Sequence, residues 1–159
     1  MISLKKQTKG FTIVELLIVI VVIGILAGLV ITTYNGIQQK ARNTERQTDL
    51  KAVQGQLEAY TAQNGRYPST ADLGSTSASN VTFIQASMKG LDKEALRDPK
   101  ATAGNYSLAT SPTVNQYAYA PTQDDGSACD DSGTKDCTKY TLTAKQEGGG
   151  ADIVYNSLN

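Results

Sequence analysis

The chain has 159 residues, 40% of them hydrophobic, and its 15 basic and 15 acidic side chains cancel. The length fits one ordinary domain, but much of the apolar content lies in one N-terminal run, which leaves a small soluble remainder with a thin core. The balanced charge gives no basic footprint for nucleic acid, and the absence of His removes the commonest general base and metal ligand. Composition therefore disfavours catalysis, and we expect no enzyme activity.

The N-terminal run predicts a membrane-spanning helix. Residues 16–31, LLIVIVVIGILAGLVI, carry no charged or polar side chain, and with residues 11–15 the run reaches the ~20 residues that span a bilayer. A secretory signal peptide would place a small-residue cleavage site after the run, but Tyr34, Asn35 and Gly36 lead there into a further helical pattern. We expect a transmembrane segment over 11–33 that stays in the protein.

Two residues at the start of this run are unusual for a plain membrane anchor. A carboxylate such as Glu15 costs about 2.5 to 3.5 kcal/mol at the centre of a bilayer, so it either reaches the interface or has a partner. Gly10 directly precedes the run, and cleavage after it would create an α-ammonium on Phe11. Glu15 is the one carboxylate of the segment that could pair with this ammonium. Such a pair between neighbouring copies is head-to-tail and generates a helical filament.

The stretch KKQTKGFTIVELLIVI closely resembles the class III signal of type IV pilins and of the pseudopilins of type II secretion. The resemblance implies that a prepilin peptidase cuts after Gly10, that residues 1–10 are a leader, that Phe11 becomes N-methylated and that Glu15 supports assembly. It also implies a precursor in the inner or cytoplasmic membrane. The implied partners are further copies of the chain and the pilus or secretion assembly machinery.

The apolar run also carries a pair of glycines. Many members of the family have a proline late in this helix, where the chain has Thr32. Gly24 and Gly28 form a G-x-x-x-G pair on one helix face, which would let two helices pack closely, so both are candidates for assembly contacts. The alternative is that a lipid-facing helix simply tolerates them.

The helix is expected to continue past the membrane as an amphipathic segment over 34–64. The pair Asn64-Gly65, just before Tyr67 and Pro68, predicts its end at a left-handed cap. Four apolar residues recur at helical spacing among charged ones and are expected to seat a sheet: Leu50, Val53, Leu57 and Tyr60.

The remainder, residues 65–159, is expected to form a small β-rich domain. Residues 69–80 are polar and small and predict a surface connector, which a short helix over Asp92–Arg97 follows. Alternation over 116–120 and 140–144, with a final apolar segment over 153–155, predicts three antiparallel strands. The stretches NGRYP and YTLTAKQEGG again resemble pilin segments. We therefore expect an α+β fold in which a long N-terminal helix packs on a small antiparallel sheet.

Cys129 and Cys137 lie between the first two expected strands. An exported domain meets an oxidising environment, so we expect these two cysteines to form a disulfide. The disulfide would stabilise the fold by roughly 2.5 kcal/mol. Aspartates in and beside this loop offer the oxygen ligands that calcium prefers, although their spacing is not that of an EF-hand. Some pseudopilins hold calcium in this region. Solvated turn residues are the alternative reading, and we expect no other cofactor. The candidate ligands are Asp124, Asp125, Asp130 and Asp131.

The sequence thus favours a structural subunit of an extracellular type IV pilus filament, which would serve adhesion, motility or DNA uptake. A pseudopilin of a type II secretion system is the alternative. A disulfide-closed loop and the missing D-P-W-G type motif after Asp98 and Pro99 favour the pilus subunit, whereas calcium would favour the pseudopilin. A monomeric membrane-anchored binding module is a further alternative, and it predicts no cleavage after Gly10.

Overall fold

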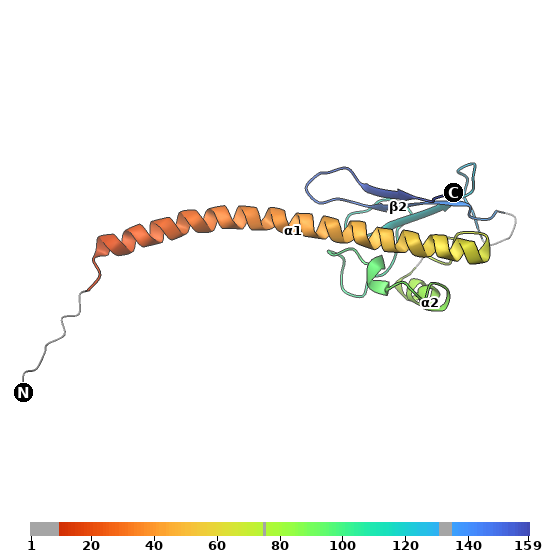
Figure 1. The fold of residues 1–159 in the computed structure, drawn as a ribbon, viewed down its shortest axis with the longest axis horizontal. Coiled ribbons are helices and arrows are strands. Elements are labelled where there is room, and N and C mark those ends of the chain that lie inside the picture. The colour runs from red at the N-terminus through yellow and green to blue at the C-terminus, as the bar shows by residue number, and fades with distance from the viewer. Residues whose placement is uncertain (1–9, 75, 131–134) are drawn as a thin grey trace, which may run out of the picture. The chain divides into compact units, whose positions relative to one another are not determined.

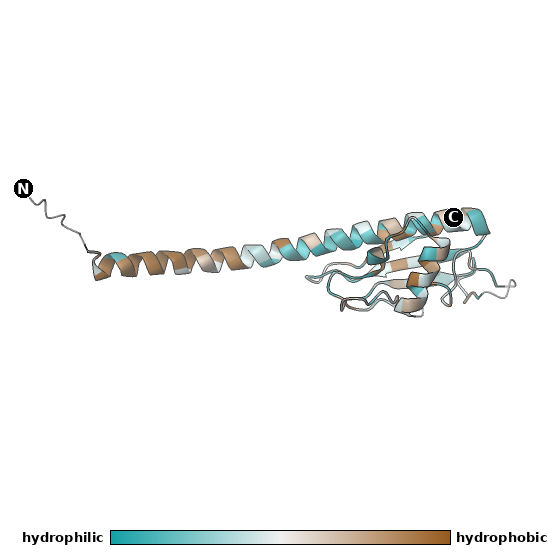
Figure 2. Cartoon of the chain, turned by 90° about the horizontal axis from the view of Figure 1, so that it is seen from below, coloured by the Kyte–Doolittle hydropathy of each residue, from teal (hydrophilic) through white to brown (hydrophobic). Residues whose placement is uncertain are grey.

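The computed structural model describes residues 10–74, 76–130 and 135–159. Its longest element is the helix α1, Ile13–Asn64 (Figure 1). In Figure 2 the N-terminal part of α1 is coloured almost entirely as hydrophobic, whereas its later part has both hydrophilic and hydrophobic residues. The helix ends at the predicted left-handed cap: Gly65 has a φ of 76°, and its N–H donates to the Thr61 carbonyl at 2.8 Å.

The chain divides into two units at a point within α1, one up to Gln38 and one over Gln39–Asn159. In the first unit the large apolar side chains of the described residues are exposed, from 88% for Phe11 to 48% for Val22. Within the described residues, α1 alone is long and apolar enough to cross a membrane, and none of its most apolar window is buried. By length and composition, this part of α1 therefore suits a bilayer or the apolar surface of another chain.

The second unit builds its core on one stripe of α1. The four apolar residues predicted to seat the sheet are all buried, with Leu50, Val53 and Leu57 at 1% exposure or less. Tyr67 packs edge-on against Tyr140 with ring centroids 4.7 Å apart. The stripe also buries a charged residue, Arg46, which the helical pattern placed on the polar face.

The predicted three-stranded antiparallel sheet is confirmed. Its strands are β1 (Ala118–Thr122), β2 (Lys139–Ala144) and β3 (Ile153–Asn156), in the order β1-β2-β3. The first strand begins two residues later than predicted, because Asn115 turns the chain with a φ of 60° just before it. β1 also includes Pro121, which an edge strand accommodates because one side of it needs no ladder hydrogen bond.

A second helix, α2 over Ser77–Ser87, corrects the prediction of a surface connector over 69–80. Thr76 caps it by accepting a hydrogen bond from the Ser79 N–H at 3.1 Å. Asn80 fixes the helix in place: it is fully buried, donates to the Tyr106 carbonyl at 2.8 Å and accepts from the Gly74 N–H at 3.0 Å.

The predicted short helix at 92–97 is present as the 3-10 helix η1, Lys93–Leu96. Asp92 caps it by accepting from the Glu94 N–H at 3.0 Å. The chain then leaves η1 through Asp98 and Pro99, where the helix was expected to stop.

Candidate assembly site

The start of α1 is closed by a reciprocal pair of hydrogen bonds between Thr12 and Glu15. The Thr12 N–H and hydroxyl both donate to the same Glu15 carboxylate oxygen, at 2.8 and 2.7 Å. The Glu15 N–H in turn donates to the Thr12 hydroxyl oxygen at 3.2 Å. This arrangement is a capping box, which satisfies helix N–H groups that have no partner in the preceding turn. It holds the one carboxylate of the apolar run at the very end of the helix.

Among the described residues, Phe11 and the large apolar side chains that follow it as far as Ile37 are exposed. Gly24 and Gly28 leave the helix surface bare, since a Cβ atom at either position would have no atom within 4 Å among the described residues. Neither glycine is needed for packing among the residues that the structure describes. Their role in assembly, like cleavage after Gly10 and the pairing of Phe11 with Glu15, stays a prediction.

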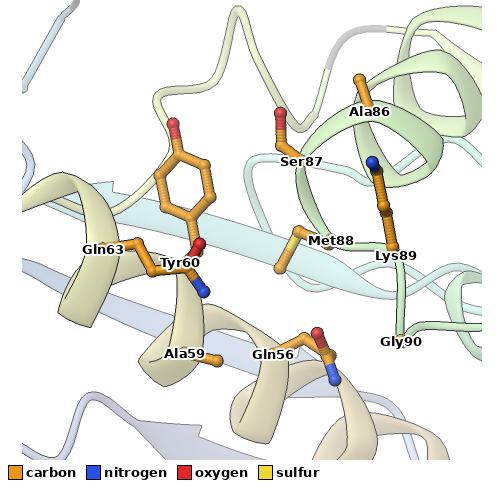
Figure 3. Close-up of a pocket in the computed structure, with 9 residues that line it drawn as sticks. All are labelled: Gln56, Ala59, Tyr60, Gln63, Ala86, Ser87, Met88, Lys89 and Gly90. Atoms are coloured by element: carbon orange, nitrogen blue, oxygen red, sulfur yellow. The ribbon is translucent and has the colours of Figure 1, made fainter.

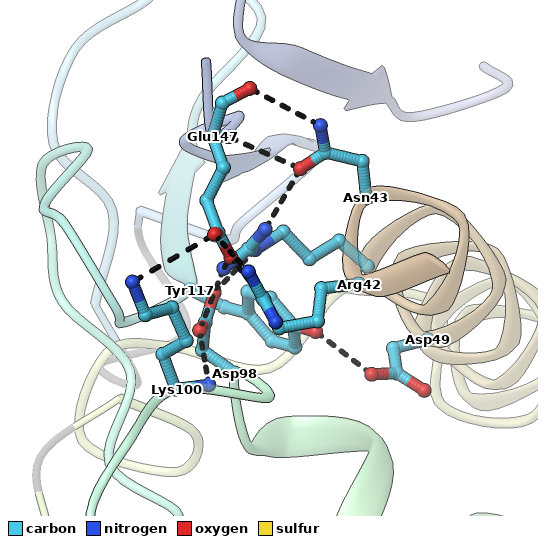
Figure 4. A network of polar contacts seen from close by, with 8 residues as sticks. Arg42, Asn43, Asp49, Asp98, Lys100, Tyr117 and Glu147 are labelled. Carbon is cyan, nitrogen blue, oxygen red and sulfur yellow. Dashed lines mark hydrogen bonds and ion pairs between the residues drawn. The ribbon is translucent and has the colours of Figure 1, made fainter. Parts of the chain in front are cut away.

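A charged cluster at the start of the second unit fixes α1 to two later segments (Figure 4). Arg42 donates from Nε and Nη2 to the two oxygens of Glu147, at 2.7 and 2.6 Å. Arg46 donates to both oxygens of Asp98, at 2.7 and 3.0 Å, and also to Glu147 at 3.0 Å. Hydrogen bonds from Arg42 and then from Arg46 lower the pKa of Glu147 from 4.5 to about 2.

Asn43 fixes the backbone of the same loop. Its side-chain oxygen accepts from the Glu147 N–H at 3.1 Å, and its amide nitrogen donates to the Glu147 carbonyl at 3.3 Å. The next two residues, Gly148 and Gly149, have φ values of 84° and 79°, a conformation that glycine adopts without strain. The turn between β2 and β3 is therefore held to α1 by both side-chain and main-chain groups.

A second polar contact from α1 reaches the sheet side of the core. The Tyr117 hydroxyl donates to Asp49 at 2.7 Å. Burial raises the pKa of Asp49, and the hydrogen bond from Tyr117 opposes this shift. Burial and the bond to Asp49 together raise the pKa of Tyr117 well above its usual range. The contact gives a half-buried carboxylate a hydrogen-bond donor.

The predicted disulfide between Cys129 and Cys137 is confirmed. Cys137 is fully buried, and its carbonyl accepts from the Tyr67 N–H at 2.8 Å, which ties the loop to the segment after α1.

The candidate calcium ligands are only partly placed by the structure. The Asp125 carboxylate accepts from the Ser127 N–H at 2.8 Å, and an Asp124 oxygen lies 3.7 Å from the Lys139 ammonium. Asp130 is described, whereas Asp131 lies outside the described residues. Within the described part of the chain, no group of three or more His, Cys, Asp or Glu residues could hold a metal ion.

The N-terminal stretch matches a family model described as the prokaryotic N-terminal methylation motif, over residues 5–31. The chain is 30% identical over 155 residues to the type II secretion system core protein G of Pseudomonas aeruginosa, and this alignment covers 93% of the chain and 92% of that protein. It is 31% identical over 162 residues to the core protein G of Vibrio cholerae, covering 95% and 92%. The chain belongs to the pilin and pseudopilin family.

Other members of this family match over a shorter stretch. The core protein G of Dickeya chrysanthemi is 37% identical over 67 residues, and the match spans less than half of that relative, 44% of its length. No solved structure matches this pilin-family chain. The family is one of structural subunits, and the methylation motif contains Gly10, Phe11 and Glu15.

The sequence pointed to the start of α1 but not to the charged cluster. Glu15 was singled out, and the structure adds Thr12 as its hydrogen-bonding partner. Arg46 and Asp98 were missed because the first was counted among the charged residues around the apolar stripe, and the second was interpreted only as the stop of the short helix. A T-x-x-E pattern at 12–15 was the available signal for the cap.

Proposed function

We propose that this chain is a pseudopilin of a type II secretion system, a structural subunit that is processed at its N-terminus and polymerised through α1. One observation carries the proposal: two proteins named core protein G resemble the chain over nearly its whole length. The apolar first unit, with its capped N-terminus, supports it. The pilus reading, which the sequence favoured, lacks such support from the relatives.

The proposed assembly uses the two charges at the start of the mature helix. Cleavage after Gly10 leaves an ammonium on Phe11, and the Glu15 carboxylate of a neighbouring copy receives it. Thr12 holds that carboxylate at the end of α1, so the acceptor is in place before the neighbour arrives. The contact joins different surfaces on the two copies, and it therefore extends a filament instead of closing a dimer.

The proposed locations and partners follow from this sequence of events. The precursor resides in the inner or cytoplasmic membrane, where a prepilin peptidase processes it. The apolar side chains of α1 then exchange lipid for the helices of other copies. The filament grows from the membrane, driven by the secretion machinery.

The first test is the intact mass and N-terminal peptide of the chain in cells that express it at native level. We expect a chain that begins at N-methylated Phe11, and we expect deletion of its gene to abolish release of the proteins that the secretion system exports. Glu15→Leu should stop filament formation, whereas Glu45→Leu, an exposed residue later in α1, should not. An unprocessed chain confined to the membrane would favour the monomeric anchored module.

A type IV pilus subunit is the second candidate, and the disulfide-closed loop favours it. A D-P-W-G motif would have favoured the pseudopilin, but in this chain Asp98 and Pro99 are followed by Lys100. The two candidates differ in the phenotype of a deletion. Loss of surface fibres, adhesion, motility or DNA uptake, with secretion unchanged, would select the pilus.

A further inference from the structure

A polar groove lies between α1 and the end of α2 (Figure 3). Its volume is about 420 Å³. Gln56, Ala59 and Gln63 line it from α1, and Ser87, Lys89 and Gly90 line it from the other side. Because Gln56 and Gln63 contribute amides and Ser87 a hydroxyl, polar hydrogen-bonding groups dominate its walls.

The groove carries a single charge, which is positive. Lys89 is the only charged residue among those that line it, and it is exposed. None of the ion pairs among the described residues involves this lysine. An ammonium, two amides and a hydroxyl together form a donor-rich surface that suits a segment bearing carboxylates.

Gly90 lies against the Gln56 amide at the wall of this groove. A Cβ atom at position 90 would lie 2.7 Å from the Gln56 amide nitrogen, closer than side chains approach one another. A side chain at this position would therefore require the flexible end of Gln56 to shift.

A carboxylate-bearing segment of matching chemistry lies elsewhere on the same unit, in the turn that follows β1. Asp124 and Asp125 are adjacent and exposed, and 77% of the Asp124 side chain is accessible. The turn is closed by bonds from the Gln123 N–H to the Ser127 carbonyl and from the Gly126 N–H to the Gln123 carbonyl, both 3.0 Å. It is therefore an ordered projection with two carboxylates, of which Asp124 also lies 3.7 Å from the Lys139 ammonium and Asp125 accepts from the Ser127 N–H.

The groove and the turn are different surfaces of one copy. The groove lies between α1 and α2, whereas the turn continues the sheet, and Figure 1 shows β2 and α2 on opposite sides of α1 in that view. A contact between two such surfaces of identical copies is heterologous. It repeats from copy to copy and produces a filament, not a closed pair.

We propose that the groove between α1 and α2 binds the Asp124–Asp125 turn of a second copy of this chain. The inference rests on the proposed function, because it assigns a lateral contact to the same filament. Both surfaces are formed before they meet, which lowers the ordering cost of the contact. The charges select this register over those that would bring like charges together.

The test exchanges the charges in the full chain, in cells that assemble it. Lys89→Glu alone, and Asp124→Lys with Asp125→Lys, should each lower the yield of sheared filaments at least about five-fold. The three substitutions together should restore the yield to within about two-fold of the wild type. Lys93→Glu is the matched control, since this exposed lysine does not line the groove, and it should leave the yield unchanged.

Two further readouts separate this inference from the proposed function. Processing at Phe11 and the amount of mature chain in the membrane should be the same in every variant. Lys89→Ala, which removes the ammonium without introducing a carboxylate, should weaken assembly less than Lys89→Glu. Two outcomes would contradict the proposed groove contact and leave the proposed function intact, provided that the wild type assembles. In the first, the single-surface variants assemble as well as the wild type; in the second, the combined variant shows no recovery. A wild type that is neither processed nor assembled overturns both.

Discussion

Arg46 and Asp98 are 52 positions apart in the chain and form a fork of two hydrogen bonds, at 2.7 and 3.0 Å, in the interior of the second unit. Their side chains are 1% and 2% exposed. Asp98 also accepts from the Lys100 N–H at 2.8 Å, so the pair fixes the chain where it leaves η1.

Asp98→Ala should therefore lower the free energy of unfolding by about 3 kcal/mol, because it leaves the Arg46 charge buried with one partner fewer. Denaturant unfolding of the full chain in detergent, followed by tyrosine fluorescence, would measure the loss. Lys139→Ala removes the partner of Asp124 in an exposed pair and should change stability little. Equal effects of the two substitutions would contradict a structural role for the buried pair.

Glu147 should make the second unit sensitive to acid. Its pKa is lowered from 4.5 to about 2 in the folded chain, first by hydrogen bonds from Arg42 and then from Arg46. The unfolded chain therefore takes up the proton first, and the stabilisation that is complete above pH 4.5 is lost as the pH falls from 4.5 to 2. The difference in melting temperature between the wild type and Glu147→Gln should become smaller as the pH falls over this range. The melting temperature of Glu45→Gln should equal that of the wild type at every pH.

Reduction of the disulfide should destabilise the second unit by about 2.5 kcal/mol, from the entropy of closing so short a loop. The cross-link spans only eight positions, from Cys129 to Cys137. Thermal unfolding with and without a thiol reductant would show the change. The double variant Cys129→Ser with Cys137→Ser should already have the lower stability and should not respond to the reductant.

Thr12 should contribute to assembly through Glu15. Thr12→Ala removes a hydroxyl that donates to the Glu15 carboxylate and accepts from the Glu15 N–H. Loss of such a cap lowers the equilibrium constant for forming the first turn of the helix about five-fold. We expect fewer sheared filaments from this variant and a yield near that of the wild type from Thr12→Ser, which keeps the hydroxyl. The N-terminal peptide must be checked alongside, because a defect in cleavage would produce the same phenotype for another reason.

Calcium should not change the melting temperature of the chain. The Asp125 carboxylate is already bonded to the Ser127 N–H, and Asp124 lies beside Lys139. The melting temperature measured in calcium and in a chelator tests this prediction, and a higher value in calcium would contradict it.

The main elements could be predicted because their signals are local. The apolar run and the spacing from Leu50 to Tyr60 identify α1, and Gly65 identifies its end. The alternation of side-chain types along the chain identifies the strands β1 and β2, which pair as expected. The helix α2 was missed because the apolar residues of its sequence, SASNVTFIQAS, do not form a stripe at helical spacing, and its position depends on Asn80, a buried polar residue.

The charged cluster could not be predicted in the same way. Arg42 and Arg46 look like ordinary members of a polar helix face, and nothing near them in sequence indicates a partner. Glu147 lies more than 100 positions away from both. Such contacts depend on which segments the fold brings together, and that information is not local.

The buried tyrosines give the second unit an optical signal of its own. The chain has eight tyrosines and no tryptophan, so phenol absorption is unobscured. Burial raises the pKa of Tyr119 well above its ordinary value of 10; for Tyr67 and Tyr140, burial and then the bonds to Glu58 do the same. These phenols stabilise the fold below pH 10, and that stabilisation is lost as the pH rises further, because only the unfolded chain ionises them readily. The appearance of their phenolate absorption in alkali would thus mark the opening of the core.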